Sequence, residues 1–173
     1  MAYALDSATT SLATTGAAIR ALVADLSTAD ARWKPAVDRW SILEVINHLV
    51  DEEVEDFRAR LDVILLQPEE MEFAPIDPEG AVLERRYCDR TLEESVQRFA
   101  EEREKSLAWL RSLEFPDLER TKRHQWMGEM TGRQMLVSWV AHDLHHVRQI
   151  TRLRYERLAQ QAAPLTLAYA GEW

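Results

Sequence analysis

Residues 130–154 read MTGRQMLVSWVAHDLHHVRQITRLR, and this stretch predicts a long amphipathic helix that carries three of the chain's five histidines. Thr131 followed by Gln134 forms a capping box, which predicts that the helix begins there. It is expected to end before Pro164, because proline cannot continue a helix. Apolar residues at helical spacing predict the side that faces the core: Leu136, Trp139, Val140, Leu144, Val147 and Ile150.

The three histidines of this stretch point in different directions. Each residue of an α-helix advances by about 100°, which places His142 and His146 side by side at the edge of the apolar arc and turns His145 toward water. Two imidazoles at positions i and i+4 project the same way and can reach one metal ion. The spacing is short and common, however, and two histidines that merely share a helix flank would look the same. A third ligand from elsewhere in the chain would decide between these interpretations.

His48 offers such a ligand, within the sequence INHLVDEE at residues 46–53. The same angular arithmetic places His48 and Glu52 on a polar edge of another predicted helix, away from the centre of its apolar face. This position is compatible with a site in a cleft where one end of a helix bundle opens. His124 has no comparable setting and is interpreted as a surface residue. The acidic run at residues 51–56 is interpreted as a solvated helix face.

Asp143 falls in the middle of the apolar face, where a buried carboxylate needs a partner. It could bond a ligand histidine or pair with an arginine from another helix, and the pairing with arginine is the favoured interpretation. HDLHH also resembles the HExxH motif of zinc proteases, but the general base of that motif must face the metal, whereas Asp143 turns to the core. The histidine–aspartate doublet of the HD phosphohydrolases needs a further aspartate downstream, and residues 144–173 contain none.

The rest of the chain also shows helical patterns. Apolar spacing and capping boxes at Ser41/Glu44 and Thr91/Glu94 predict three more long helices, with a short helical turn after the first. No stretch of strand periodicity is long enough to build a sheet. A long connection at residues 67–89 separates the second helix from the third. We therefore predict an all-α fold, a four-helix bundle with a long crossover between helices 2 and 3. The predicted helical segments are residues 7–26, 28–33, 41–66, 91–115 and 131–163.

Composition and charge narrow the class of protein further. The chain has 173 residues, enough for one domain, which we expect to span residues 1–173. Its net charge of -9 repels phosphate backbones and anionic lipids, so neither a nucleic-acid nor a membrane partner is expected. Cys88 is the single cysteine, so no internal disulfide can form. We interpret Cys88 as a small buried apolar residue, and the absence of signal-peptide features predicts a cytoplasmic protein.

Two stretches together resemble the DinB-like (YfiT/DinB) superfamily, which is distinct from the DNA polymerase of similar name. RWSILEVINHLVDEE, residues 39–53, is similar to the family's tryptophan, helix cap and histidine–leucine pair at the second helix. Residues 130–154 are similar to its fourth helix, where two histidines four residues apart precede a Gln-Ile pair. The spacing between the stretches also fits, so the resemblance covers nearly the whole chain.

The resemblance implies a four-helix bundle, frequently a homodimer, with a divalent metal near one end of the bundle. By position the ligands are His48, His142 and His146, and zinc or nickel is the expected ion. Family members resemble thiol-dependent transferases and isomerases, or hydrolases. We therefore expect a metal-dependent enzyme that activates water or a low-molecular-weight thiol toward a small-molecule substrate, with Glu52 as the candidate general base. The alternatives are a non-catalytic stress-response protein that binds a metal or small ligand, and a plain bundle without metal.

Overall fold

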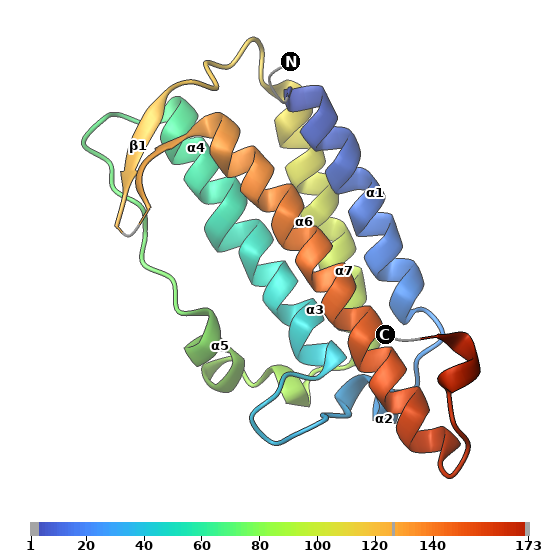
Figure 1. Cartoon of the computed structure of the whole chain (residues 1–173). Helices are drawn as coiled ribbons and strands as arrows, with labels where there is room; N and C mark the ends of the chain where they lie inside the picture. The colour runs from blue at the N-terminus through green and yellow to red at the C-terminus, as the bar shows by residue number, and fades with distance from the viewer. Residues whose placement is uncertain (1–3, 126, 172–173) are drawn as a thin grey trace.

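The computed structural model describes residues 4–125 and 127–171, and within them four long helical segments pack side by side (Figure 1). The second segment is a continuous helix that contains a π-helical stretch, η1, between α3 and α4. This arrangement confirms the prediction of an all-α four-helix bundle. The segments are α1 (Leu5–Val23), α3 (Ile42–Asp51) with η1 (Glu52–Phe57) and α4 (Arg58–Leu66), α6 (Leu92–Ser112) and α7 (Gly132–Ala162).

The crossover between the second and third long segments returns along the bundle, so that α4 and α6 point the same way (Figure 1). It is partly helical, which the sequence did not indicate, and contains α5 (Pro78–Glu84) and the 3₁₀ turn η2 (Tyr87–Asp89). The Asp77 side chain caps α5 by accepting a hydrogen bond from the Gly80 N–H. Cys88 was expected to be buried but is exposed, because Tyr87 takes the buried position of η2.

Two of the three predicted capping boxes form completely. The Ser41 and Thr131 side chains each accept a hydrogen bond from the backbone N–H three residues on, and the Glu44 and Gln134 side chains each accept one from the backbone N–H of the cap residue. Thr91 caps α6 through the Glu94 N–H, but its hydroxyl rather than its backbone bonds the Glu94 carboxylate. The third capping box is therefore only half made.

Short elements connect the long helices. The predicted helical turn is α2 (Thr28–Arg32). The hairpin of β1 (Thr121–His124) and β2 (Gly128–Thr131) was not expected, because strands of four residues are too short to show a period. Gly128 has a φ of 72°, the left-handed conformation that glycine adopts without a Cβ clash. A last 3₁₀ turn, η3, spans Ala168–Ala170.

The core consists of two apolar clusters, one toward each end of the bundle. Every long segment has a polar residue between its contributions to the two clusters, and these polar residues are Thr15, Glu53, Arg103 and Asp143. Among the described residues, no helix combines the length and the apolarity that crossing a membrane requires. The main members of one cluster are Leu12, Phe57, Leu61, Leu107, Leu136 and Trp139, and of the other Ile19, Ile46, Leu49, Phe99, Ile150 and Leu153.

Candidate metal centre

Three histidines from two helices converge between α3 and α7. The Nε2 atom of His142 lies 3.2 Å from Nε2 of His48 and 3.1 Å from Nε2 of His146. One ligand atom of each of the three lies within 4.8 Å of those of the other two. Two nitrogen ligands of a tetrahedral zinc ion, each about 2.0–2.1 Å from the metal, lie roughly 3.3 Å apart. The spacing of these imidazoles is therefore close to the geometry that such an ion requires.

His48 is buried rather than on a polar edge, which corrects the expectation from its helix wheel. All ten residues of α3 are buried, because α2, α5, α6 and α7 surround this helix. A wheel assumes that one side of a helix faces water, and α3 has no such side. The site also lies beside the polar residues between the two apolar clusters, not at an open end of the bundle.

On α7 the predicted orientations of the three histidines are correct, but the buried arc is displaced. His146 is buried, His142 is partly buried and His145 is exposed. With Leu136 set to zero, the buried residues of α7 centre near 305°, about 60° from the predicted centre. Leu144 was expected in the core but is 55% exposed for this reason. The same displacement places His146 inside the buried arc and leaves His142 at its edge.

A hydrogen bond to Gln149 determines which ring nitrogen of His146 faces His48 and His142. Its Nδ1 lies 2.7 Å from Oε1 of Gln149, and since a carbonyl oxygen only accepts, Nδ1 carries the proton and donates. The lone pair of Nε2 is thereby directed at the other imidazoles, as in a metal-ligating histidine. His142 Nδ1 is buried without a hydrogen-bond partner among the described residues. Residues three apart on a helix are neighbours, so the position of Gln149 three residues after His146 is the sequence signal that could have identified it as a partner of that histidine.

Burial keeps all three imidazoles neutral. Desolvation, with the neighbouring histidines adding to it, lowers the pKa of His48 to about 3 and that of His142 to about 2. Desolvation also lowers the pKa of His146 to about 4, although its bond to Gln149 opposes the shift. A neutral imidazole is the form that binds a metal, so the cluster needs no deprotonation at neutral pH to accept one.

Glu52 lies against two of the three histidines. Its Oε1 is 3.5 Å from Nδ1 of His48, and its Oε2 is 4.0 Å from Nε2 of His142. Burial raises the pKa of Glu52 to about 9, and the charges of Asp56 and Asp51 add to the effect. A buried carboxyl group beside converging imidazoles could act as a base or join the ligand set.

Aromatic rings surround the imidazoles and limit their movement. The ring of Trp40 meets that of His48 edge-on, with centroids 4.9 Å apart. Phe57 lies 5.0 Å from the His142 ring and stacks on Trp139 at 5.6 Å. Trp40 immediately precedes the Ser41 cap of α3, so the start of the helix and the position of His48 are set together.

A buried ion cluster of Arg103, Glu53 and Asp143 lies behind the histidines. Arg103 binds Asp143 through two nitrogens at 2.6 and 2.9 Å and donates to Oε1 of Glu53 at 2.6 Å. Thr15 also donates to Asp143, and Trp139 donates to Glu53 at 3.0 Å. The preferred interpretation of Asp143, a structural pairing with an arginine, is correct.

The acidic run at residues 51–56 is only partly a solvated face, contrary to expectation. Asp51, Glu52 and Glu53 are buried, and three different environments receive them. Glu52 meets the histidines and Glu53 the buried ion cluster, while Asp51 accepts hydrogen bonds from Tyr87 and, at 2.5 Å, from Arg85. The first half of a run that looked solvated in the sequence is therefore buried against the crossover, the histidines and the ion cluster.

His124 is also buried, at 8% exposure, although it was expected on the surface. The hairpin packs its β1 strand against α4, and the His124 ring lies with its Nε2 3.0 Å from Nη1 of Arg60. His124 is not part of the cluster of His48, His142 and His146, and it packs where the hairpin meets α4.

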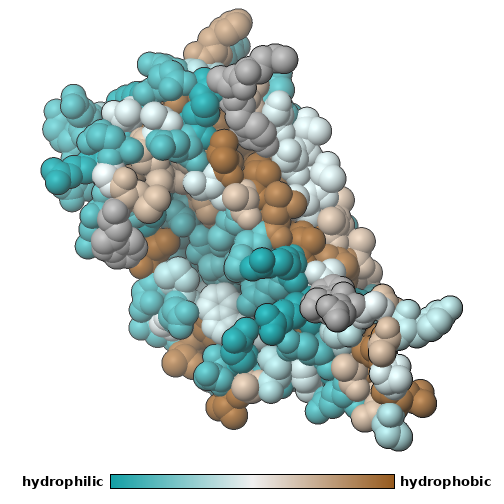
Figure 2. Space-filling view, in the orientation of Figure 1, coloured by the Kyte–Doolittle hydropathy of each residue, from teal (hydrophilic) through white to brown (hydrophobic). Residues whose placement is uncertain are grey.

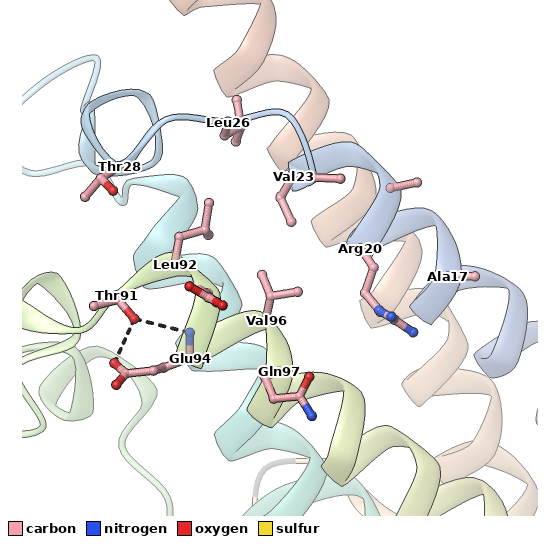
Figure 3. Close-up of a pocket in the computed structure, with 13 residues that line it drawn as sticks. Ala17, Arg20, Val23, Leu26, Thr28, Thr91, Leu92, Glu94, Val96 and Gln97 are labelled. Carbon is pink, nitrogen blue, oxygen red and sulfur yellow. Dashed lines mark hydrogen bonds between the residues drawn. The ribbon is translucent and has the colours of Figure 1, made fainter.

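A large open groove of about 1230 Å³ lies elsewhere, between α1, α2 and the start of α6 (Figure 3). Apolar side chains of Val23, Leu26 and Val96 line it, with Arg20 and Gln97 at its side. None of the three clustered histidines lines this groove, so its size alone does not relate it to the chemistry of the site.

The chain belongs to the DinB superfamily, whose family model matches residues 11–150. YfiT from Bacillus subtilis, described as a probable metal-dependent hydrolase with an unusual four-helix bundle topology, has a similar structure. It shares 20% identity with a TM-score of 0.77, over 88% of this chain and 87% of that one. A conserved protein from Enterococcus faecalis shares 17% identity with a TM-score of 0.65, over 86% of this chain and 94% of that one. No curated protein matches the chain in sequence. At these identities the structural likeness establishes the fold alone.

Proposed function

We propose that this protein is a metal-dependent hydrolase of a small-molecule substrate, with His48, His142 and His146 as ligands of one divalent ion. The observation that carries the proposal is the convergence of the Nε2 atoms of three neutral imidazoles, two buried and one partly buried, with the Glu52 carboxyl group 4.0 Å from one of them. The description of YfiT as a probable metal-dependent hydrolase supports the same class of function. Zinc or nickel suits an all-imidazole donor set.

Each residue of the site has a distinct task in this proposal. A bound divalent ion would supply Lewis acidity, which lowers the pKa of a coordinated water or thiol toward neutrality. The positive charge of a bound ion would also lower the raised pKa of Glu52, so that its ionised form is available at neutral pH. The Glu52 carboxylate then takes the proton from the water as the water oxygen forms a bond to the electrophilic atom of the substrate. The bond to the leaving group breaks, and Glu52 returns the proton to that group. Gln149 holds the His146 ring, while Trp40 and Phe57 pack against the rings of the other two histidines.

A low-molecular-weight thiol is the alternative nucleophile, which would make the protein a transferase. Hydrolysis of activated esters and amides by the zinc- and nickel-loaded protein, measured with and without a panel of thiols, separates the two reactions. Turnover without thiol, lost on chelation and restored by the metal, is the expected result. Turnover only with thiol would establish the transferase, and no turnover with any panel member would favour the non-catalytic binding protein.

Replacement of Glu52 by glutamine tests its role as the base. Gln preserves the shape of the buried side chain but cannot accept the proton, so we expect kcat to fall by about 10²–10⁴-fold with metal content unchanged. Glu104→Gln on the exposed side of α6 is the matched control and should retain full activity. Full activity of Glu52→Gln with bound metal would remove Glu52 from the mechanism.

We further propose that the protein works in the cytoplasm as a homodimer, following the resemblance to its family. Sedimentation equilibrium of the full chain would give twice the 20.0 kDa mass of one chain if this holds. A single-chain mass across the micromolar range would overturn the dimer without affecting the metal site.

A further inference from the structure

A second groove, of about 900 Å³, lies on α7 directly beside the candidate metal centre. It is lined chiefly by Arg39, His145, Arg148, Gln149, Arg152 and Glu156, and we call it the basic groove. Figure 2 shows hydrophilic side chains gathered over the middle of α7 on this face. None of the three candidate ligands lines the groove itself.

The polar groups of the basic groove are mainly unpaired donors. The exposed guanidinium groups of Arg39 and Arg148 have no hydrogen-bond or ion-pair partner among the described residues. Arg152 pairs with Glu156 at 2.7 Å, which leaves that carboxylate already engaged. Gln149 uses its Oε1 to accept from His146, so the NH₂ group of its side chain remains available to donate.

Charge sets this groove apart from the rest of the molecule. Three arginines against one glutamate give it a formal charge of about +2 in a chain with a net charge of -9. A small cavity at the other side of the site is instead acidic, with Asp51, Glu52, Glu55 and Asp56 around His48. Grouped positive charge in a concave surface raises the local concentration of anions. Planar guanidinium groups match carboxylate and phosphate oxygens in geometry.

We propose that the basic groove binds the anionic end, a carboxylate or a phosphate, of the small molecule on which this protein acts. Arg39 and Arg148 are the residues that recognise the anion, and Gln149 donates to it through its NH₂ group. That the occupant is the substrate rests on the proposed function, whereas the anion site itself does not. Arg39 is next to Trp40, whose ring meets His48, and Gln149 is bonded to His146, so the groove borders two residues that contact the candidate ligands.

Binding of simple anions tests the groove without any catalytic assay. Succinate and inorganic phosphate are titrated separately into ¹⁵N-labelled full-length protein, both zinc-loaded and metal-free, while arginine side-chain N–H resonances are recorded. We expect saturable shifts at Arg39 and Arg148 with at least one of the two anions, weakened by added chloride. Saturation by succinate alone identifies a carboxylate site, and saturation by phosphate alone identifies a phosphate site.

Two variants make the result specific. Arg39→Gln/Arg148→Gln should weaken binding by at least about tenfold for each lost charged hydrogen-bond donor. Arg111→Gln changes an exposed arginine at the far end of α6, removes one arginine charge outside the groove, and should bind like the parent protein. Both changes affect exposed side chains, so circular dichroism should confirm folding. Absence of saturation, or equal binding by the double variant and the parent, overturns the groove proposal.

A pair of matched esters then relates the groove to the reaction. In the zinc-loaded protein, the double variant should raise KM for 4-nitrophenyl hemisuccinate about 10²-fold and leave kcat/KM for neutral 4-nitrophenyl acetate unchanged. Equal KM values for the hemisuccinate in parent and double variant would show that bound anions are not substrates. Failure to hydrolyse either ester would count against the hydrolase, while the anion titration would still decide the groove.

Discussion

At the scale of single residues, the direction of one hydrogen bond prepares the site for a metal. Gln149 accepts from Nδ1 of His146, which leaves the Nε2 lone pair directed at His142 and His48. An outer partner of this kind orients a ligand imidazole and increases its basicity, and its loss typically costs 10–100-fold in metal affinity. In the proposed metal site, Gln149 would therefore contribute to metal binding without touching the ion.

Substitution of Gln149 tests that contribution. Gln149→Leu removes the acceptor, so we expect zinc affinity to fall by about 10–100-fold in a chelator-competition titration. Gln149→Glu keeps an acceptor at the same place and should retain or increase the affinity of the parent protein. Equal affinity of the leucine and glutamate variants would contradict this role.

Sequence reasoning correctly oriented the histidines of α7 but misjudged the surroundings of His48. The i and i+4 positions of His142 and His146 follow from helix geometry alone, and so does the outward direction of His145. The burial of His48 and Glu52 depends on α2 and α5, whose positions no local pattern specifies. Long-range packing of that kind is what a single sequence conveys least.

At the scale of secondary-structure elements, the π-helical stretch η1 carries two neighbouring buried glutamates that face different parts of the bundle. Glu52 faces the histidines and Glu53 faces Arg103, although they are adjacent in the sequence. Stretches of π-helix insert an extra residue into a helix turn and are frequent at functional sites. The buried ion cluster then joins η1, α6 and α7, and Arg103 also donates to the Leu12 carbonyl of α1 at 2.8 Å.

Removal of Arg103 should destabilise the bundle severely. Arg103→Met leaves Glu53 and Asp143 buried without their cation, which typically costs about 3–5 kcal/mol of unfolding free energy. Arg58→Met on the same face of the bundle breaks a more accessible pair with Glu102 and should cost about 1 kcal/mol or less. Urea unfolding of both variants measures the difference, and similar small losses would show that Arg103 is not a central support.

The long helices were predictable, and the short irregular elements were not. Capping residues and prolines located the second segment, α6 and α7 to within a few residues of their observed ends, and apolar spacing did the same for α1. Neither η1 nor the β1–β2 hairpin has a sequence period of its own, because each depends on tertiary contacts. The length of the crossover correctly indicated a bundle that is not a simple up-and-down arrangement.

At the scale of the whole molecule, the buried ionisable groups make stability depend on pH in the metal-free protein. Burial lowers the pKa of His48, His142 and His146 to about 3, 2 and 4. Below about pH 6.5 these histidines are therefore protonated in the unfolded chain and still neutral in the folded chain. Stability therefore falls as pH falls. The pKa of Glu52 is raised to about 9, so between its unfolded value of 4.5 and about 9 its contribution falls as pH rises.

These opposing effects predict a maximum of stability near pH 6.5 for the metal-free protein. Three histidine protons outweigh the single Glu52 proton below that pH, which gives a loss of about 2–3 kcal/mol per pH unit toward pH 5. Above pH 6.5 the Glu52 contribution alone predicts a shallower decline. Urea unfolding of chelator-treated protein between pH 5 and 9 measures the profile, and constant stability from pH 5 to 7 would contradict it.

Metal content of the purified protein and of single histidine variants tests the central claim most directly. Inductively coupled plasma mass spectrometry should find about one divalent ion per chain in the parent protein and in His145→Ala, whose side chain is exposed beside the site. His48→Ala, His142→Ala and His146→Ala should each lose most of that ion after the same dialysis. Equal metal content in all five proteins, or none in the parent after incubation with zinc and nickel, would contradict the account.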